Sequence, residues 1–133
     1  MSAVTSPWTP RVLSILRIVT GYLLLTHGTA KILGFPKVDM FANLQLTSMY
    51  GVAGILELIL GALLIVGLFS RFAAFIASGL CAAAYFIGHA SENTFPFPLL
   101  NGGEAAVLFC FAFLYLAVAG PGPWSVDAAR QAA

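Results

Sequence analysis

The chain has 133 residues, of which 60% are hydrophobic and only 8% are charged. Soluble domains carry about 25% charged residues, so a chain of this composition cannot cover its own surface in water and is expected to lie in a lipid bilayer. Its length fits a single domain over residues 1–133, and a net charge of +1 without a basic run gives no reason to expect a nucleic-acid partner.

Four apolar segments have the composition of membrane helices. They cover about residues 12–33, 49–69, 72–89 and 104–119. Because a spanning helix needs about 17–25 residues, the last two suffice only if their polar ends, His89 and Glu104, enter the membrane. The first segment is longer than the apolar core of a signal peptide, about 7–15 residues, so we expect it to stay in the membrane. The sequence therefore predicts an all-α, integral membrane four-helix bundle.

The connections between these segments carry recognisable signals. Pro7 and Pro10 are expected to precede the first helix, and the two-residue link Ser70-Arg71 makes the second and third helices antiparallel neighbours. Residues 37–46 mix charged and apolar side chains, which suits a short interfacial helix. Residues 93–103 contain two prolines and two glycines and are expected to form a loop.

The charge distribution predicts the orientation. One side of the predicted bundle carries four arginines, and the other carries Lys31 and Lys37. By the positive-inside rule the arginine side is cytoplasmic, which places both termini of this multi-pass protein in the cytoplasm. The arginines are Arg11, Arg17, Arg71 and Arg130.

Several ionisable side chains fall at similar depths in the predicted membrane. At about 1.5 Å per helical residue, His27, Lys31, His89 and Glu104 lie near the outer ends of their helices and Glu57 lies near the midplane. Buried charges in lipid each cost kilocalories unless they are paired or hydrated. We therefore expect the four outer residues to form a polar pocket that binds a ligand or relays protons, with Glu57 as a deeper member of the site.

Two ion pairs are predicted as structural features. Arg17 is expected to pair with Glu57, and Arg71 with Asp127 at the cytoplasmic end. The alternative for Lys31 is that its ammonium group reaches out to the interface.

Helical periodicity also predicts which faces point inward. Each helix has one stripe that bears polar residues, and these stripes are expected to meet inside the bundle. On the fourth helix the predicted inner stripe consists of Glu104, Leu108, Phe111 and Tyr115.

No metal site is expected. The two cysteines, Cys81 and Cys110, lie within apolar runs without a CxxC pattern and are expected to be buried hydrophobic side chains, with a disulfide or redox pair as the alternative. No HExxH or ExxH spacing places two metal ligands on one helix.

Four motifs together resemble the DoxX family. They are "HGTAK" at residues 27–31, "AGILELILGALLIVGLFSR" at 53–71, "NGGEAA" at 101–106 and "GPGPWSVD" at 120–127. The resemblance implies a small four-helix protein of bacterial inner membranes that is associated with quinol-oxidase and other redox systems. The matching positions are His27, Gly28, Lys31, Glu57, Gly67, Arg71, Gly103, Glu104, Gly120, Gly122, Ser125 and Asp127, and His89 fits less securely.

Two functional hypotheses follow. The first is a membrane subunit of a redox system that offers a quinone or proton-relay site near the outer face and works with a partner oxidoreductase, with Phe86, Phe109 and Phe111 available to line a groove for the quinone tail. The second is a non-catalytic scaffold or assembly factor with a purely structural polar core. The sequence leaves the catalytic residues and the oligomeric state open, a homo-oligomer included.

Overall fold

The protein consists of two long helical hairpins. The computed structural model describes residues 6–132, which contain helices and no strands. In the first hairpin α1 (Trp8–Ile32) packs on α2 (Met49–Val66), and in the second α3 (Ser70–Ala84), extended by the π-helical turn η2 (Tyr85–His89), packs on α5 (Glu104–Ala119). Three short elements complete the described chain: η1 (Asp39–Phe41), α4 (Pro98–Asn101) and α6 (Val126–Ala132). The predicted all-α architecture is confirmed.

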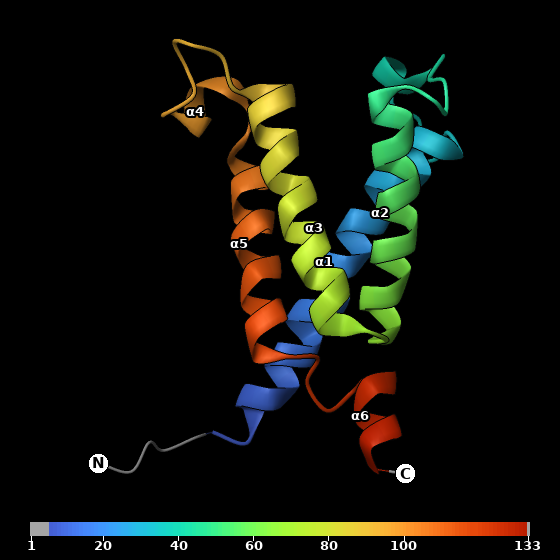
Figure 1. Ribbon diagram of the computed structural model, residues 1–133, viewed down its shortest axis with the longest axis vertical. Helices are drawn as coiled ribbons and strands as arrows, with labels where there is room; N and C mark the ends of the chain where they lie inside the picture. Colours follow the sequence, from blue (N-terminus) through green and yellow to red (C-terminus); the bar gives the residue numbers. More distant parts are fainter. Residues whose placement is uncertain (1–5, 133) are drawn as a thin grey trace.

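The long helices suit a membrane. Trp8–Ile32, Met49–Val66 and the continuous run Ser70–His89 are long and apolar enough to span one, and α5 is apolar but has only 16 residues. Figure 1 shows η1 and α4 at one end of the molecule, called the outer end here, and α6 with the start of α1 at the other, the inner end. Both ends of the described chain therefore lie on the same side, although which side is cytoplasmic stays a prediction.

Several predicted boundaries shift for local reasons. α1 begins at Trp8, and Pro10 lies in its first turn, where the missing N–H costs no helical hydrogen bond. α2 ends at Val66 because Gly67 takes a left-handed conformation with φ of 76°. α3 begins two residues earlier than predicted, the loop predicted at 93–103 contains α4, and the interfacial segment forms only the three-residue turn η1.

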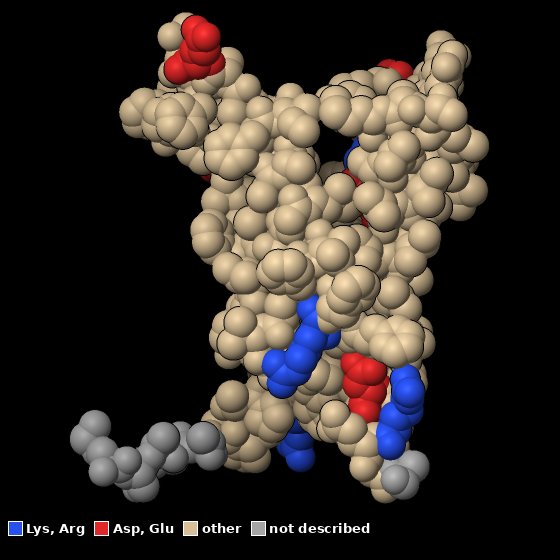
Figure 2. Space-filling model, viewed as in Figure 1, with Lys and Arg blue, Asp and Glu red and all other residues tan. Residues whose placement is uncertain are grey.

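The two hairpins are packed together at the inner end and separate toward the outer end. The buried apolar core lies where they meet and includes Leu64, Ala73, Ala77, Phe113 and Leu116. Toward the outer end the hairpins diverge (Figure 1), and the space-filling view shows a hollow between them in which basic and acidic atoms are visible (Figure 2). The bundle is therefore closed at its inner end and open at its outer end.

Glycines allow α1 and α2 to approach closely. A Cβ on Gly28 would lie 2.7 Å from the backbone nitrogen of Leu58, and one on Gly61 would lie 2.8 Å from the Cα of Leu25. Both clashes are with backbone atoms, which cannot move aside as a flexible side chain does. The first hairpin therefore depends on these glycines, as membrane helix pairs with small residues at the interface commonly do.

We expect Gly28→Ala to destabilise the protein by about 1–3 kcal/mol, the usual cost of overpacking. Gly79→Ala on α3 is the matched control, because a Cβ there meets nothing within 4 Å. The control is expected to change stability by less than about 1 kcal/mol, the scale of the glycine–alanine difference in helix propensity. The measurement is thermal unfolding in detergent, and equal effects of the two variants would contradict the close approach.

Candidate functional site

A buried ion pair joins the two helices of the first hairpin. Lys31 Nζ lies 2.6 Å from Glu57 Oε1, and both side chains are 9% exposed. It is the one ion pair found within residues 6–132. The second carboxylate oxygen, Glu57 Oε2, is buried and has no hydrogen-bond partner there. A buried polar oxygen without a partner is costly, so the site has an unused capacity to accept a hydrogen bond.

The direction of helical side chains explains this pairing. Side chains lean toward the N-terminus of their helix, which is the inner end for α1 and the outer end for α2. Lys31 on α1 and Glu57 on α2 therefore lean toward each other. Lys31 does not extend to the interface, the alternative considered above, because its side chain points along α1 into the bundle.

The predicted Arg17–Glu57 pair is wrong for the same reason. Arg17 leans toward the inner end and Glu57 toward the outer end, so the two side chains point apart. Arg17 instead hydrogen-bonds the carbonyl of Leu64, which lies seven residues after Glu57 on α2, or about 10 Å along the helix axis. Glu57 therefore belongs with Lys31 toward the outer end, and Arg17 forms a separate polar centre toward the inner end.

Two aromatic residues complete the surroundings of Lys31. The Lys31 ammonium lies 5.5 Å from the ring centroid of Phe41 in η1, and the Phe41 and Tyr50 rings are 6.3 Å apart. The Tyr50 hydroxyl is 3.7 Å from where a Cβ on Gly88 would stand, so the Tyr50 side chain reaches across from α2 toward η2. Sequence reasoning missed both aromatics, because only the fold of the η1 loop brings Phe41 over Lys31. A tyrosine near a helix end was the one available signal.

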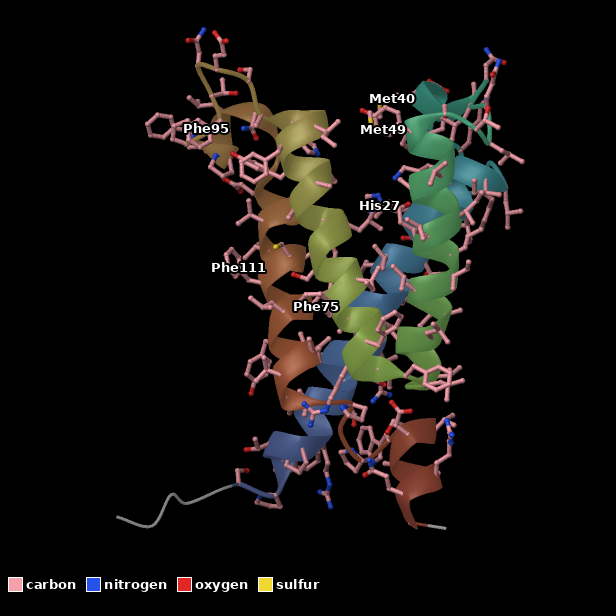
Figure 3. All side chains as sticks on the ribbon, viewed as in Figure 1. His27, Met40, Met49, Phe75, Phe95 and Phe111 are labelled. Atoms are coloured by element: carbon pink, nitrogen blue, oxygen red, sulfur yellow. The ribbon has the colours of Figure 1, made fainter. Side chains whose placement is uncertain are left out.

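His27 belongs to the same region. It lies one helical turn before Lys31, is exposed, and in Figure 3 its side chain projects between the two hairpins. The same view shows Met40 and Met49 at the outer end of α2, on the side that faces the second hairpin. Lys31, Glu57, His27, Phe41 and Tyr50 form the outer site. A π-helical turn at η2, opposite this site, fits the tendency of such turns to occur at functional positions.

The predicted four-residue pocket is divided between the hairpins. His89 and Glu104 lie at the outer end of the second hairpin, and no described hydrogen bond or ion pair connects either to His27 or Lys31. His89 Nδ1 is 3.2 Å from the carbonyl oxygen of Asn101, a contact in which this nitrogen donates its proton. Glu104 is exposed in the first turn of α5, where a negative charge complements the helix dipole. Both residues lie at the predicted depth, but divergence of the hairpins keeps them apart from Lys31.

The predicted inner stripe of the fourth helix is also wrong. Glu104, Leu108, Phe111 and Tyr115 are all exposed, and Figure 3 shows Phe111 pointing away from the bundle. The buried residues of α5 are Phe113 and Leu116. Because α5 is apolar around its whole circumference, periodicity could not select the face that packs on α3.

The inner end contains a second polar centre built around Arg17. Its side chain is fully buried, and its guanidinium donates hydrogen bonds to the carbonyl oxygens of Leu64 at 2.8 Å, Trp124 at 2.5 Å and Pro121. Ser14 supports the same segment by accepting a hydrogen bond from the Trp124 N–H at 3.1 Å. Residues 120–127, which we call the C-terminal strap, are thereby bound under the bundle.

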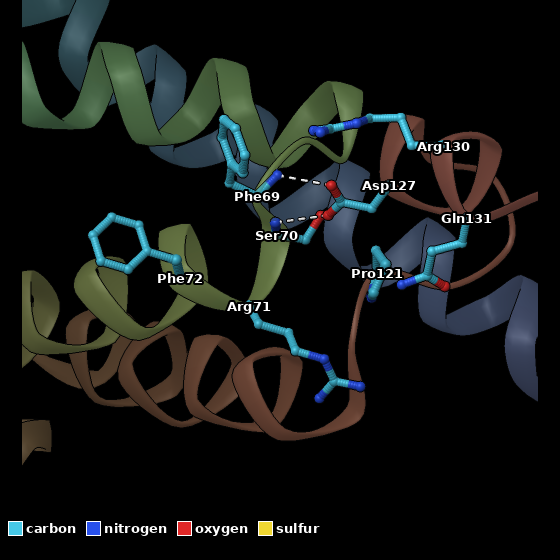
Figure 4. A pocket seen from close by; sticks show the side chains of 8 residues that line it. All are labelled: Phe69, Ser70, Arg71, Phe72, Pro121, Asp127, Arg130 and Gln131. Atoms are coloured by element: carbon cyan, nitrogen blue, oxygen red, sulfur yellow. Dashed lines mark hydrogen bonds between the residues drawn. The ribbon is translucent and has the colours of Figure 1, made fainter. Parts of the chain in front are cut away.

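Asp127 and Arg71 lie at the same end but do not form the predicted salt bridge. The Asp127 carboxylate accepts hydrogen bonds from the N–H groups of Phe69 at 2.9 Å and Ser70 at 2.8 Å, which the start of α3 leaves unpaired (Figure 4). Arg71 points the other way and donates to the carbonyls of Ala117 and Val118 at the end of α5. Each charge thus caps a different helix end.

These hydrogen bonds alter the titration of Asp127. Burial by itself raises the pKa of this carboxyl group, but the hydrogen bonds from Ser70 and Phe69 and the nearby charge of Arg130 outweigh burial and hold the pKa below its ordinary value. Asp127 therefore remains ionised at neutral pH, which is the state that caps α3.

The remaining chemistry-bearing residues form no metal cluster within the described range. No group of three or more His, Cys, Asp or Glu side chains is positioned to hold a metal ion among residues 6–132. Cys81 is buried, Cys110 is half-buried, and both are free thiols. Ser78 of α3 donates a hydrogen bond to the carbonyl of Cys110 on α5 at 2.7 Å, and this hydrogen bond links the two helices of the second hairpin.

Comparison with known proteins identifies the family of this chain. A model of the DoxX family matches residues 12–90, which is more than half of the chain. An uncharacterized protein of Haemophilus influenzae is 44% identical over 120 residues, covering 89% of this chain and 90% of that protein. No solved structure matches. The chain is an integral membrane protein, and it belongs to the DoxX family.

Proposed function

We propose that this protein is the membrane subunit of a redox system and that its outer site binds a quinone head group. The observation that carries the proposal is the buried Lys31–Glu57 pair, whose carboxylate has one oxygen without a partner. The hollow between the hairpins contains basic and acidic atoms (Figure 2), and His27, one helical turn from Lys31, projects between the hairpins (Figure 3). A lipid-soluble ligand can reach such a site sideways from the bilayer. Membrane-embedded ionisable groups commonly mark ligand or proton pathways.

The donors and acceptors of the outer site suit a quinone. The Lys31 ammonium has three N–H donors and donates one hydrogen bond to Glu57 Oε1, so another N–H can donate to a quinone carbonyl oxygen. Glu57 Oε2 can accept a hydrogen bond from a quinol hydroxyl. Reduction of a quinone consumes two electrons and two protons. His27, one turn away and exposed, is placed to carry protons between the site and the surface, because one imidazole nitrogen can accept a proton while the other donates one.

The electrons in this proposal come from a partner oxidoreductase. The side chains of the outer site hold and transfer protons, but none of them is an electron carrier. The partner therefore supplies a flavin, haem or metal centre, and the present chain supplies the quinone site. We place this activity at the outer face of a bacterial inner membrane, following the predicted orientation.

A second function is supported by the same ion pair. Lys31–Glu57 links α1 to α2 and, together with Phe41, fixes the η1 loop over the hairpin. A pair with only this role would make the protein a scaffold or assembly factor that recruits a partner to the membrane. The two functions differ in whether the outer site binds a ligand.

Titration of the detergent-solubilised full chain with ubiquinone-1, followed by equilibrium dialysis, separates them. We expect the wild type to bind and Glu57→Gln to weaken binding about 10–100-fold, the equivalent of one hydrogen bond to a charged group at about 1.5–3 kcal/mol. His27→Ala tests the site without touching a buried residue and is also expected to weaken binding.

The matched control is Glu92→Gln, which neutralises an exposed carboxylate in the outer loop. It is expected to leave binding unchanged. Absence of wild-type binding, or unchanged binding by His27→Ala and by folded Glu57→Gln, rejects the quinone site. Variants that only lower the melting temperature would favour the scaffold.

A further inference from the structure

The inner end of the molecule carries a surface groove unrelated to the outer site. Its volume is about 450 Å³, and it lies between the start of α3, the C-terminal strap and α6. Figure 4 shows Arg71 and Arg130 on different sides of it, with Asp127 between them. In Figure 2 two basic groups flank an acidic one on the same face of the molecule.

The groove has a net positive charge, because two arginines and one aspartate line it. Asp127 uses both carboxylate oxygens to accept backbone hydrogen bonds from Phe69 and Ser70. Arg71 lines the groove and donates through Nη1 to the carbonyls of Ala117 and Val118, and no described hydrogen bond uses its Nε or Nη2. Arg130 is exposed and its guanidinium carbon lies 5.6 Å from the ring centroid of Phe69. Two arginines outnumber the one carboxylate, whose oxygens are already hydrogen-bonded to the backbone, so the groove favours an anionic ligand.

The apolar edge of the groove indicates where that anion comes from. Phe69 is 56% exposed and Phe72 is 69% exposed, and both lie where the spanning helices α2 and α3 meet. Spanning helices end at the depth of the lipid headgroups. Exposed aromatic rings beside two guanidinium groups therefore match a ligand with a charged head and an apolar body.

We propose that this groove binds an anionic phospholipid, with its phosphate between Arg71 and Arg130 and its acyl chains along Phe69 and Phe72. The site is independent of the proposed quinone site and stands if that proposal fails. Bound lipid would bridge α3 and α6 and so hold the C-terminal strap against the bundle. Lysine or arginine side chains near a membrane surface attract anionic lipids by about 1 kcal/mol each.

Native mass spectrometry of the full chain in detergent, titrated with dioleoyl phosphatidylglycerol, tests the proposal. We expect retained phosphatidylglycerol on the wild type and about fivefold weaker retention on Arg130→Gln, the fold-change that corresponds to about 1 kcal/mol. Arg130→Lys preserves the charge and is expected to bind like the wild type. Arg130 is exposed on α6, so its substitution is not expected to unfold the protein.

Arg11→Gln is the matched control. Arg11 is also exposed and lies at the same end, stacked over Trp8 at 5.0 Å outside the groove. Equal weakening by Arg11→Gln would show that only overall charge matters and would overturn the site. Equal retention of zwitterionic dioleoyl phosphatidylcholine would overturn it as well. Inorganic phosphate is expected to compete poorly, and displacement of the lipid by millimolar phosphate would reassign the groove to a free anion.

Discussion

Replacing Arg17 with methionine is expected to release the C-terminal strap and to destabilise the protein by about 4 kcal/mol or more. The buried guanidinium donates to three backbone carbonyls, on Leu64, Pro121 and Trp124. Hydrogen bonds to charged groups contribute about 1.5–3 kcal/mol each, and their loss leaves buried acceptors without partners. Amide hydrogen exchange over residues 120–132 measures the release, and thermal unfolding in detergent measures the lost stability.

Two further variants separate charge from geometry at this position. Arg17→Lys keeps the charge, but an ammonium group lacks the planar fork that reaches several carbonyls, so it is expected to restore only part of the stability. Arg11→Met removes an exposed arginine from the same helix and is expected to change stability by less than about 0.5 kcal/mol. If exchange over the strap were unchanged in Arg17→Met, then Ser14 and Asp127 would have to be the groups that hold it.

Replacing Lys31 with methionine is expected to lower the free energy of unfolding by about 3–5 kcal/mol, the usual cost of removing one partner from a buried ion pair. The methionine preserves much of the side-chain volume, so the loss reports the unpaired charge of Glu57 rather than a cavity. The measurement is denaturant unfolding in detergent micelles. A variant as stable as the wild type would show that Lys31 does not neutralise Glu57.

The double variant Lys31→Met with Glu57→Leu tests whether the stability lost in Lys31→Met comes from the unpaired charge of Glu57. With both charges removed, the desolvation cost disappears, and replacement of a buried pair by apolar residues is often neutral or stabilising. We expect the double variant to recover most of the stability and to lose quinone binding. This combination would establish that the pair is retained for its chemistry at the cost of stability, whereas retained binding would contradict the proposed function.

The sequence alone determined the class and the helical content of the protein. Its 60% hydrophobic and 8% charged residues require a lipid environment, and the apolar segments between proline and glycine signals located the long helices. The fourth predicted helix, residues 104–119, coincides with α5. Composition and local breakers suffice for these conclusions because both depend on residues that are close together in the chain.

Only the tertiary structure decided which charges meet. The sequence predicts the depth of a side chain in the membrane but not the direction in which the side chain leans. Side chains on α1 and α2 lean in opposite directions, and this pairs Glu57 with Lys31 rather than with Arg17. The same holds for Asp127, which the fold of the C-terminal strap brings to the N–H groups of α3, over 50 residues away in the chain. The divergence of the hairpins separates His89 and Glu104 from Lys31 (Figure 1). How far the hairpins stay together depends on the buried core that they share, which includes Leu64, Ala77 and Phe113. Such contacts join segments that are distant in the chain, so no local pattern records them.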